Sequence, residues 1–289
     1  STVMSFYSMA TGIWPYETKY EMYEKIHEVY DGETLFSKLK KQGYECHMVF
    51  DEEWNIFFDY YDYFRDDVTI HALEGLRQGV GSHYIHEGFL QPDDEKVERA
   101  FQMTSKVVKE ILNSTGDVFL WIHFPHVLYG RVSYGGDIEL FDRYVGMIRE
   151  LVPDDCITIT SDHGNANGHK GMIGYGFDAY QPSIKIPLIT PRINGMKTYN
   201  KATSNIDLYD LLLKRIPNHK FIYSDTAYRA QKHRRLAIIY DHYKYIFNKM
   251  TGKEELYDLE FDPLEDFSLM EDYIYDQDRK INAPSRELY

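Results

Sequence analysis

Apolar positions along this chain follow two spacings, one helical and one typical of strands. Recurrence every three or four residues predicts amphipathic helices, and these lie at residues 2–12, 32–43, 92–113, 136–151 and 207–213. Short apolar or β-branched runs predict strands, and these lie at residues 46–50, 117–124, 157–160 and 184–190. Because the two kinds of element alternate, the pattern predicts an α/β fold with a mostly parallel sheet between helix layers. The runs at 117–124 and 157–160 are expected to be neighbours in that sheet.

The pattern changes after about residue 225. Runs at 235–240 and 243–247 flank Asp241-His242, which predicts a hairpin, and residues 255–259 add a further strand. We therefore expect a core domain over residues 1–225 and a small C-terminal subdomain, with an antiparallel sheet, over residues 226–289.

Composition narrows the possible functions. The net charge is -14, and no long Lys/Arg block supplies a phosphate-binding surface, which argues against nucleic acid as a partner. No apolar run reaches membrane-spanning length and no signal peptide is visible, so the compartment stays unassigned. The two cysteines, Cys46 and Cys156, fit no metal-ligand spacing, and Cys156 is expected to begin the buried strand at 157–160.

The strongest candidate for chemistry follows that strand. Residues 157–160 run into Ser161-Asp162-His163-Gly164, and ligands of open α/β sheets collect beyond the carboxyl ends of strands. A carboxylate beside an imidazole suits a divalent cation. A simple turn that caps the next element explains these four residues equally well.

Three further segments place polar side chains where a site could use them. The helix at 2–12 begins with hydroxyl residues, and a helix N-terminus favours an oxyanion; an ordinary N-cap is the alternative for Thr2. The strand at 117–124 delivers His126 just beyond its end, and His169 lies in the loop after the Asp-His pair. Either histidine could instead satisfy backbone groups or face solvent.

Taken in order, several segments resemble the sulfatase branch of the alkaline phosphatase superfamily. Residues 161–164 resemble its Ser-Asp-His-Gly metal motif, and residues 2–12 match the length of its nucleophile motif. The remaining matches are its Pro-His-x-Pro-Tyr motif, a helix entry led by Asp207, and its Lys-Tyr-Ile, Glu-Leu-Tyr-Asp-Leu and Asp-Pro ending, at residues 125–129, 205–208, 243–246, 255–259 and 262–263. The set spans nearly the whole chain.

This resemblance assigns roles to the candidate residues. It implies that Asp162 and His163 bind one divalent metal ion, with Ca, Mg, Mn and Zn all open. It places Thr2 at the nucleophile and Ser5 at the substrate-binding Ser of the same motif.

The resemblance also concerns the two other histidines. It implies that His126 binds the ester oxygen or protonates the leaving group, and that His169 contacts the substrate or the metal.

Departures from the family pattern bear on the substrate. Phe6 stands where sulfatases carry an Arg, and Asp51 and Gly176 stand about where they carry two Lys that grip sulfate. Thr2 cannot become formylglycine, which requires Cys or Ser. A Thr nucleophile instead resembles the phosphotransferase members, such as lipoteichoic acid synthase and phosphoethanolamine transferases. We therefore expect a small-molecule, glycan-linked or polymer-linked phosphate ester as substrate, with a sulfate ester as the alternative.

One family element precedes the first residue of this sequence. The family's first strand, with an acidic metal ligand, lies upstream of the nucleophile, which is Thr2 here. Either the sequence is a piece of a longer chain, or the protein is a relative that cannot hold its metal tightly. A metal-dependent hydrolase or phosphotransferase, a sulfatase proper, and an inactive binding or scaffold protein are therefore all retained as hypotheses.

Overall fold

The structure is a computed structural model. It describes residues 2–14, 17, 32–51, 66–73, 94–124, 134–166, 168–172, 174–192, 202–226 and 234–270. The chain forms two compact units, one of residues 26–157 and one of residues 1–25 with 158–289. Within the described residues, no helix is long and apolar enough to cross a membrane.

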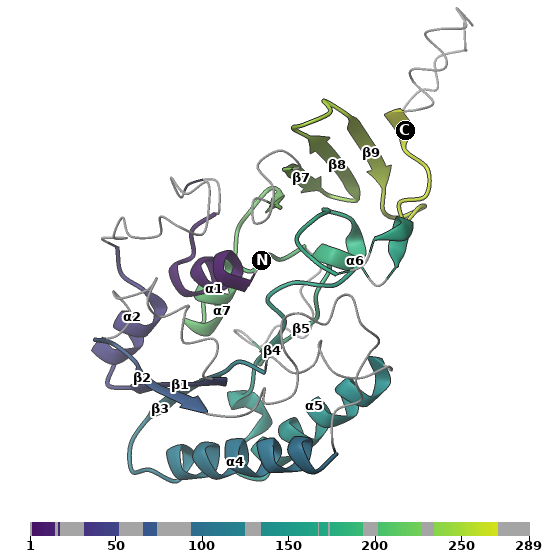
Figure 1. Cartoon of the computed structure of the whole chain (residues 1–289). Helices are drawn as coiled ribbons and strands as arrows, with labels where there is room; N and C mark the ends of the chain where they lie inside the picture. The colour runs from purple at the N-terminus through teal and green to yellow at the C-terminus, as the bar shows by residue number, and fades with distance from the viewer. Residues whose placement is uncertain are drawn as a thin grey trace, which may run out of the picture. The chain divides into compact units, whose positions relative to one another are not determined.

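A parallel sheet is the centre of the unit at residues 26–157 (Figure 1). Its strands are β1 (Glu45–Asp51), β2 (Thr69–Leu73) and β3 (Val118–Ile122). The order is β2-β1-β3, and both pairings are parallel. This confirms the α/β fold with a parallel sheet.

Helices cover both faces of this sheet. On one face, Phe36 of α2 (Leu35–Lys41) packs its ring 6.0 Å and 6.1 Å from the rings of Phe119 and Trp121. The other face packs against α4 (Asp94–Leu112) and α5 (Tyr134–Arg149). Its buried core consists of Val49, Leu73, Val108, Ile111, Tyr144 and Met147.

The second unit begins with α1 (Thr2–Thr11), which packs against α7 (Asp207–Leu212) (Figure 1). Helix α1 is followed by a turn at Gly12, whose φ of +72° favours glycine. A Cβ added there would lie 3.1 Å from the ring of Tyr209. Both the turn and the close approach of α7 therefore require glycine at this position.

Three expectations around residue 157 are wrong. The strand there is short, β4 (Ile159–Thr160), and it pairs antiparallel with β5 (Leu188–Ile189) instead of lying beside β3. The apolar run at 184–190 is divided, because its first residue ends α6 (Gln181–Ile184) before β5 begins. Cys156 is exposed and ends the 3₁₀ helix η5 (Asp154–Cys156).

A four-stranded antiparallel sheet lies near the C-terminal end of the described chain. Its strands, in order, are β6 (Ile222–Asp225), β7 (Arg235–Tyr240), β8 (Tyr243–Asn248) and β9 (Glu254–Asp258). The β7–β8 hairpin is confirmed, and Asp241 in its turn has a φ of +55°. Because β6 begins at Ile222, the sheet starts four residues before residue 226; the domain boundary itself stays a prediction.

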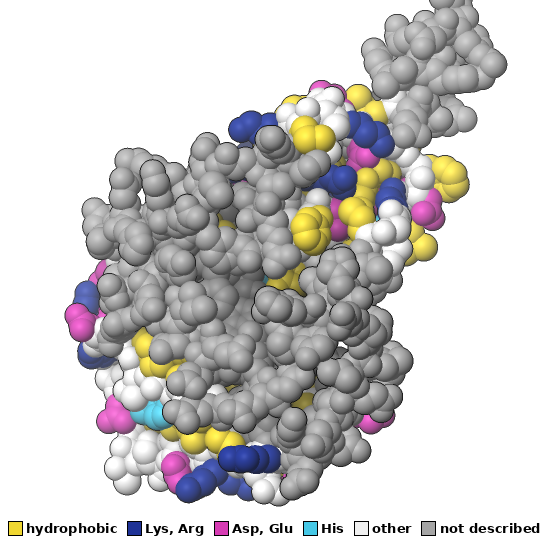
Figure 2. All heavy atoms as spheres, in the orientation of Figure 1, with side chains coloured by type: hydrophobic (Ala, Val, Ile, Leu, Met, Phe, Trp, Pro, Cys, Tyr) yellow, Lys and Arg dark blue, Asp and Glu magenta, His cyan; other side chains and the backbone are white. Residues whose placement is uncertain are grey.

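The two faces of this sheet differ in burial. One face is buried and contains an ion pair of Lys244 and Glu265, whose Nζ and Oε1 atoms lie 2.5 Å apart. Burial lowers the pKa of Lys244, although the negative charge of Glu265 opposes this shift. Hydrophobic side chains also lie at the surface among charged ones in the region of β7 to β9 (Figure 2), where Tyr240 is 63% exposed.

Candidate functional site

Asp162 and His163, directly after β4, form the centre of the candidate site. Their side chains converge, with Asp162 Oδ2 3.2 Å from His163 Nε2, and they are only 14% and 10% exposed. The other carboxylate oxygen, Oδ1, accepts a hydrogen bond of 2.9 Å from the backbone N–H of His163. The carboxylate is therefore held in one orientation, with Oδ2 directed at the imidazole.

The second ring nitrogen of His163 determines what Nε2 can do. Nδ1 lies 2.9 Å from the carbonyl oxygen of Gly164. A carbonyl oxygen can only accept, so Nδ1 carries the proton in this contact. In the neutral imidazole, Nε2 then presents a lone pair to Asp162 Oδ2. A divalent ion between these two atoms would be coordinated by both lone pairs.

Neighbouring polar groups hold the backbone of this pair. Ser161 Oγ donates to the carbonyl of His163 at 2.7 Å, and Asn205 Nδ2 donates to the carbonyl of Asp162 at 2.7 Å. Asp207, which is 1% exposed, accepts from the backbone N–H of Ser204, the residue before Asn205, at 2.7 Å and lies 2.5 Å from His219 Nε2. Burial raises the pKa of Asp207, although both partners oppose this shift.

Gly164 is required by its surroundings. A Cβ at this position would lie 2.1 Å from the carbonyl oxygen of Pro182, and the Gly164 N–H donates to Ser183 O at 2.9 Å. The first turn of α6 therefore lies directly on the Ser-Asp-His-Gly segment, and only glycine allows that approach.

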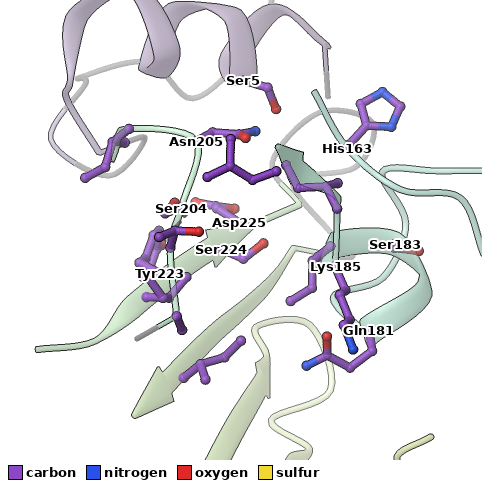
Figure 3. A pocket seen from close by; sticks show the side chains of 18 of the residues that line it. Ser5, His163, Gln181, Ser183, Lys185, Ser204, Asn205, Tyr223, Ser224 and Asp225 are labelled. Atoms are coloured by element: carbon purple, nitrogen blue, oxygen red, sulfur yellow. Dashed lines mark hydrogen bonds between the residues drawn. The ribbon is translucent and has the colours of Figure 1, made fainter. Parts of the chain in front are cut away.

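A cavity of about 520 Å³ includes this pair in its lining. Ser5 from α1, Asn205 and Gly176 also line it, and much of the remaining lining consists of hydroxyl and amide side chains. Ser5 and His163 lie near one end of the cavity, whereas Lys185 lies at the other (Figure 3). This volume is within the range of about 300–1,000 Å³ that is usual for small-molecule sites.

Two carboxylates of the cavity lining already have hydrogen-bond partners. Asp225 accepts three hydrogen bonds from Arg234, and burial raises the pKa of the nearby Tyr223. Asp178 accepts from the backbone N–H of Tyr180 and from Ser183 Oγ, both at 2.9 Å. Within the described residues, Lys185 lines the cavity without an ion pair.

The other predicted site residues are Thr2, His126 and His169, and the structure describes only part of this set. Thr2 begins α1, the helix that carries Ser5, but its side chain and the whole of His126 lie outside the described residues. His169 begins the 3₁₀ helix η6 (His169–Gly171), packs edge-on to Tyr180 with ring centroids 5.8 Å apart, and buries Nε2 without a hydrogen-bond partner among the described residues. His169 is not among the described residues that line the cavity, and its role stays a prediction.

Asp162 and His163 fit a divalent ion in type and orientation. Ligand oxygen and nitrogen atoms bind such ions at about 2.0–2.2 Å, so two atoms 3.2 Å apart can share one ion. Within the part of the chain that the structure describes, no third His, Cys, Asp or Glu completes a metal-binding group. The pair therefore supplies part of a ligand set.

Sequence reasoning did not single out three residues that shape this site. They are Asn205, Lys185 and Tyr175, whose ring stacks on His163. Asn205 was detectable in part, because it lies in a segment that matches the family pattern. The other two have no spacing or motif that distinguishes them from ordinary loop residues.

The parallel sheet covered by helices on both faces, together with the separate antiparallel sheet, defines an α/β protein with the fold of sulfatases and the alkaline phosphatase superfamily. No protein-family model and no curated protein sequence matches this chain. The similarity is therefore seen in solved structures, and it concerns the fold.

Three solved structures illustrate it. A 2-O glycosaminoglycan sulfatase shares 15% sequence identity with a TM-score of 0.63, over 96% of this chain and 79% of that one. A protein in complex with its substrate D-glucosamine-2-N,6-O-disulfate shares 12% identity with a TM-score of 0.56, over 97% and 86% of the two chains. An alkaline phosphatase superfamily protein from Vibrio parahaemolyticus shares 14% identity with a TM-score of 0.53, over 96% and 76%.

Proposed function

We propose that this protein is a metal-dependent hydrolase or transferase that acts on a phosphate ester, with a sulfate ester as the alternative substrate. One observation carries the proposal. Asp162 Oδ2 and His163 Nε2 face each other at 3.2 Å at the wall of a cavity that Ser5 also lines. The fold is that of proteins named as sulfatases, one of them described as acting on 2-O groups of glycosaminoglycans.

In this proposal Asp162 and His163 hold one divalent ion. When bound, such an ion stabilises negative charge on an attacking oxygen and on the ester. The attacking group is the Thr2 hydroxyl, at the N-terminus of α1. Its oxygen forms a bond to phosphorus, the bond from phosphorus to the leaving alcohol breaks, and the hydroxyl proton passes to solvent. His126 protonates the departing alkoxide, and water or a second alcohol then releases the phosphoryl group from Thr2.

Other residues bind and orient the ester in this proposal. Ser5, which lies with His163 near one end of the cavity, is assigned a hydroxyl contact to the ester, and His169 is assigned a substrate contact. Gly176 lines the cavity without a side chain at about the position of a sulfate-gripping Lys in the resemblance. The missing Lys side chain supports a phosphate ester over a sulfate ester as substrate. A phosphate ester carries the larger negative charge, and the metal ion can compensate that charge in place of the Lys.

The test is an ester panel with defined metals. We would assay an aryl phosphate, a phosphodiester and an aryl sulfate, each with EDTA and with Mn²⁺, Zn²⁺, Ca²⁺ or Mg²⁺. Metal-dependent phosphate release that is lost in Asp162→Asn and in Thr2→Ala supports the proposal. Asp210→Asn, which breaks the surface ion pair with Arg215, is the matched control and should keep wild-type activity.

Two outcomes would contradict the proposal in different ways. Metal-dependent sulfate release that survives Thr2→Ala would show that the substrate is a sulfate ester and that Thr2 is not the nucleophile. A chain that binds no divalent ion and cleaves no ester would favour the binding or scaffold hypothesis.

A further inference from the structure

The aromatic ring of Tyr175 lies flat against the imidazole of His163. The ring centroids are 4.2 Å apart and the planes differ by 24°. We propose that Tyr175 is a positioning residue that fixes His163 in the orientation needed to bind a metal ion. This inference rests on the proposed function, in which His163 is a ligand.

Two contacts together define the orientation of the imidazole. The stack restrains one face of the ring, and the 2.9 Å contact from Nδ1 to the carbonyl of Gly164 restrains its edge. A half-turn of the ring about its Cβ–Cγ bond would keep the stack but would lose the Nδ1 contact. A tilt would keep that contact but would open the stack. With both contacts in place, Nε2 can face only Asp162 Oδ2, 3.2 Å away.

Such outer contacts affect metal affinity because a free ligand must otherwise be ordered when the ion binds. Partners of metal-binding histidines commonly contribute about 10-fold to 100-fold in affinity. An aromatic stack contributes about 0.5–1.5 kcal/mol beyond its buried area, which corresponds to roughly 2-fold to 13-fold. The stack alone therefore predicts an effect of several-fold, up to about tenfold.

The local backbone explains how a residue 12 positions after His163 returns to it. The loop between them is closed by a hydrogen bond of 2.8 Å from Ala166 N to Gly174 O. Gly174 and Gly176, on either side of Tyr175, have φ values of +91° and +79°. A Cβ on Gly174 would meet only the ring of Phe177, at 3.8 Å, so this glycine is required for its backbone angle and not for space.

The experiment compares Tyr175→Phe with Tyr175→Leu in the full chain. Isothermal titration with Mn²⁺ and with Zn²⁺ gives the metal affinity without any substrate. We expect Phe to keep the wild-type affinity, since it retains the ring, and Leu to lose several-fold, up to about tenfold. Tyr240→Leu, at a residue that is 63% exposed, is the matched control and should leave the affinity unchanged.

A second measurement separates positioning from a general loss of structure. Nitrogen-15 NMR of the metal-free chain should show His163 protonated at Nδ1 in the wild type and in Tyr175→Phe, and a mixture of the two tautomers in Tyr175→Leu. Unchanged circular dichroism would show that the variant is folded.

The outcomes distinguish the two proposals. If the wild type binds metal and Tyr175→Leu binds equally tightly with an unchanged tautomer, the positioning role is wrong and the proposed function stands. If neither ion binds the wild type, or if Asp162→Asn leaves the affinity unchanged, the metal site itself is wrong and the inference falls with it.

Discussion

Replacing Gly164 by alanine tests the contact on which the candidate site is built. The added Cβ would lie 2.1 Å from the carbonyl oxygen of Pro182 and 3.0 Å from its carbonyl carbon. Both are backbone atoms, so no side-chain rotation can relieve the overlap. The segment that begins α6 must move until the Cβ–oxygen distance exceeds 3.0 Å.

The expected cost has two parts. Overpacking against a fixed backbone costs about 1–3 kcal/mol. The same movement lengthens the 2.9 Å hydrogen bond from Gly164 N to Ser183 O, and such a bond contributes about 0.5–1.5 kcal/mol. We therefore expect Gly164→Ala to lower the free energy of unfolding by about 2–4 kcal/mol. Metal affinity should fall as well, because the Gly164 carbonyl accepts from His163.

Gly146→Ala is the matched control, because it makes the same chemical change in a different setting. Gly146 lies in α5, is exposed, and has no atom of the described residues within 4 Å of its added Cβ. A glycine inside a helix costs about 0.5–1 kcal/mol relative to alanine, so this variant should be stabilised by that amount. The two substitutions should therefore change the free energy of unfolding in opposite directions.

Urea unfolding followed by circular dichroism measures both variants. Because the chain has two compact units, hydrogen exchange of peptides from residues 158–190 and from α5 assigns each change to its unit. An unfolding free energy for Gly164→Ala within 0.5 kcal/mol of wild type, with unchanged exchange at 158–190, would refute the close approach of Pro182.

Three other predictions concern single contacts. Thr34 caps α2 by accepting from Ser37 N at 3.0 Å, so Thr34→Ala should cost about 1 kcal/mol in urea unfolding, and an unchanged midpoint would exclude this cap. Cys46 is buried and its pKa is raised to about 11 by burial, so a thiol reagent at pH 7.5 should label one native thiol, and Cys156→Ser should abolish the labelling. Burial raises the pKa of Asp207 above its ordinary value of 3.8, so wild-type stability relative to Asp207→Asn should be highest below that pH and should fall as the pH rises above it; a rise in relative stability there would contradict the raised pKa.

Local patterns predicted most elements of the fold. Helices α4 and α5 carry apolar residues at helical spacing along their whole length, and the β7–β8 hairpin has alternating strands around a two-residue turn. Each of these signals is contained within the element itself. The sequence was therefore sufficient for their type and for their bounds to within about two residues.

The partners of each strand were harder to predict from the sequence, because strand pairing depends on residues far apart in the chain. Strand β2 (Thr69–Leu73) is short and mostly half-buried, and its pairing with β1 defines it. The run at 157–160 looked like a central strand, yet its two-residue strand β4 pairs antiparallel with β5. A short apolar run does not reveal its partner.

In the candidate site, too, local contacts were predictable from the sequence and long-range contacts were not. The Ser-Asp-His-Gly motif was visible because its members are consecutive, and the contact from Asp162 Oδ1 to His163 N is local. Tyr175 and Asn205 reach the pair from loops that only the folded chain brings together. Their contacts with the pair depend on the folded structure, and no spacing in the sequence indicates these contacts.

The charges around the cavity imply that metal and ester bind together. Beside Asp162, the cavity is also lined by Asp178, Asp225, Asp241 and Glu260. Of the three basic residues in the described lining, His163 belongs to the metal pair and His242 already lies 3.1 Å from Asp241 Oδ2, which leaves Lys185 at the other end of the cavity. An anionic ester placed beside Asp162 would therefore meet like charge unless a cation lies between them. We expect EDTA to abolish binding of a non-hydrolysable phosphonate analogue as well as turnover, and Lys185→Ala to weaken binding without changing metal affinity. Tight phosphonate binding in the presence of EDTA would show that the anion is held elsewhere in the cavity, and the metal would then serve the reaction step alone.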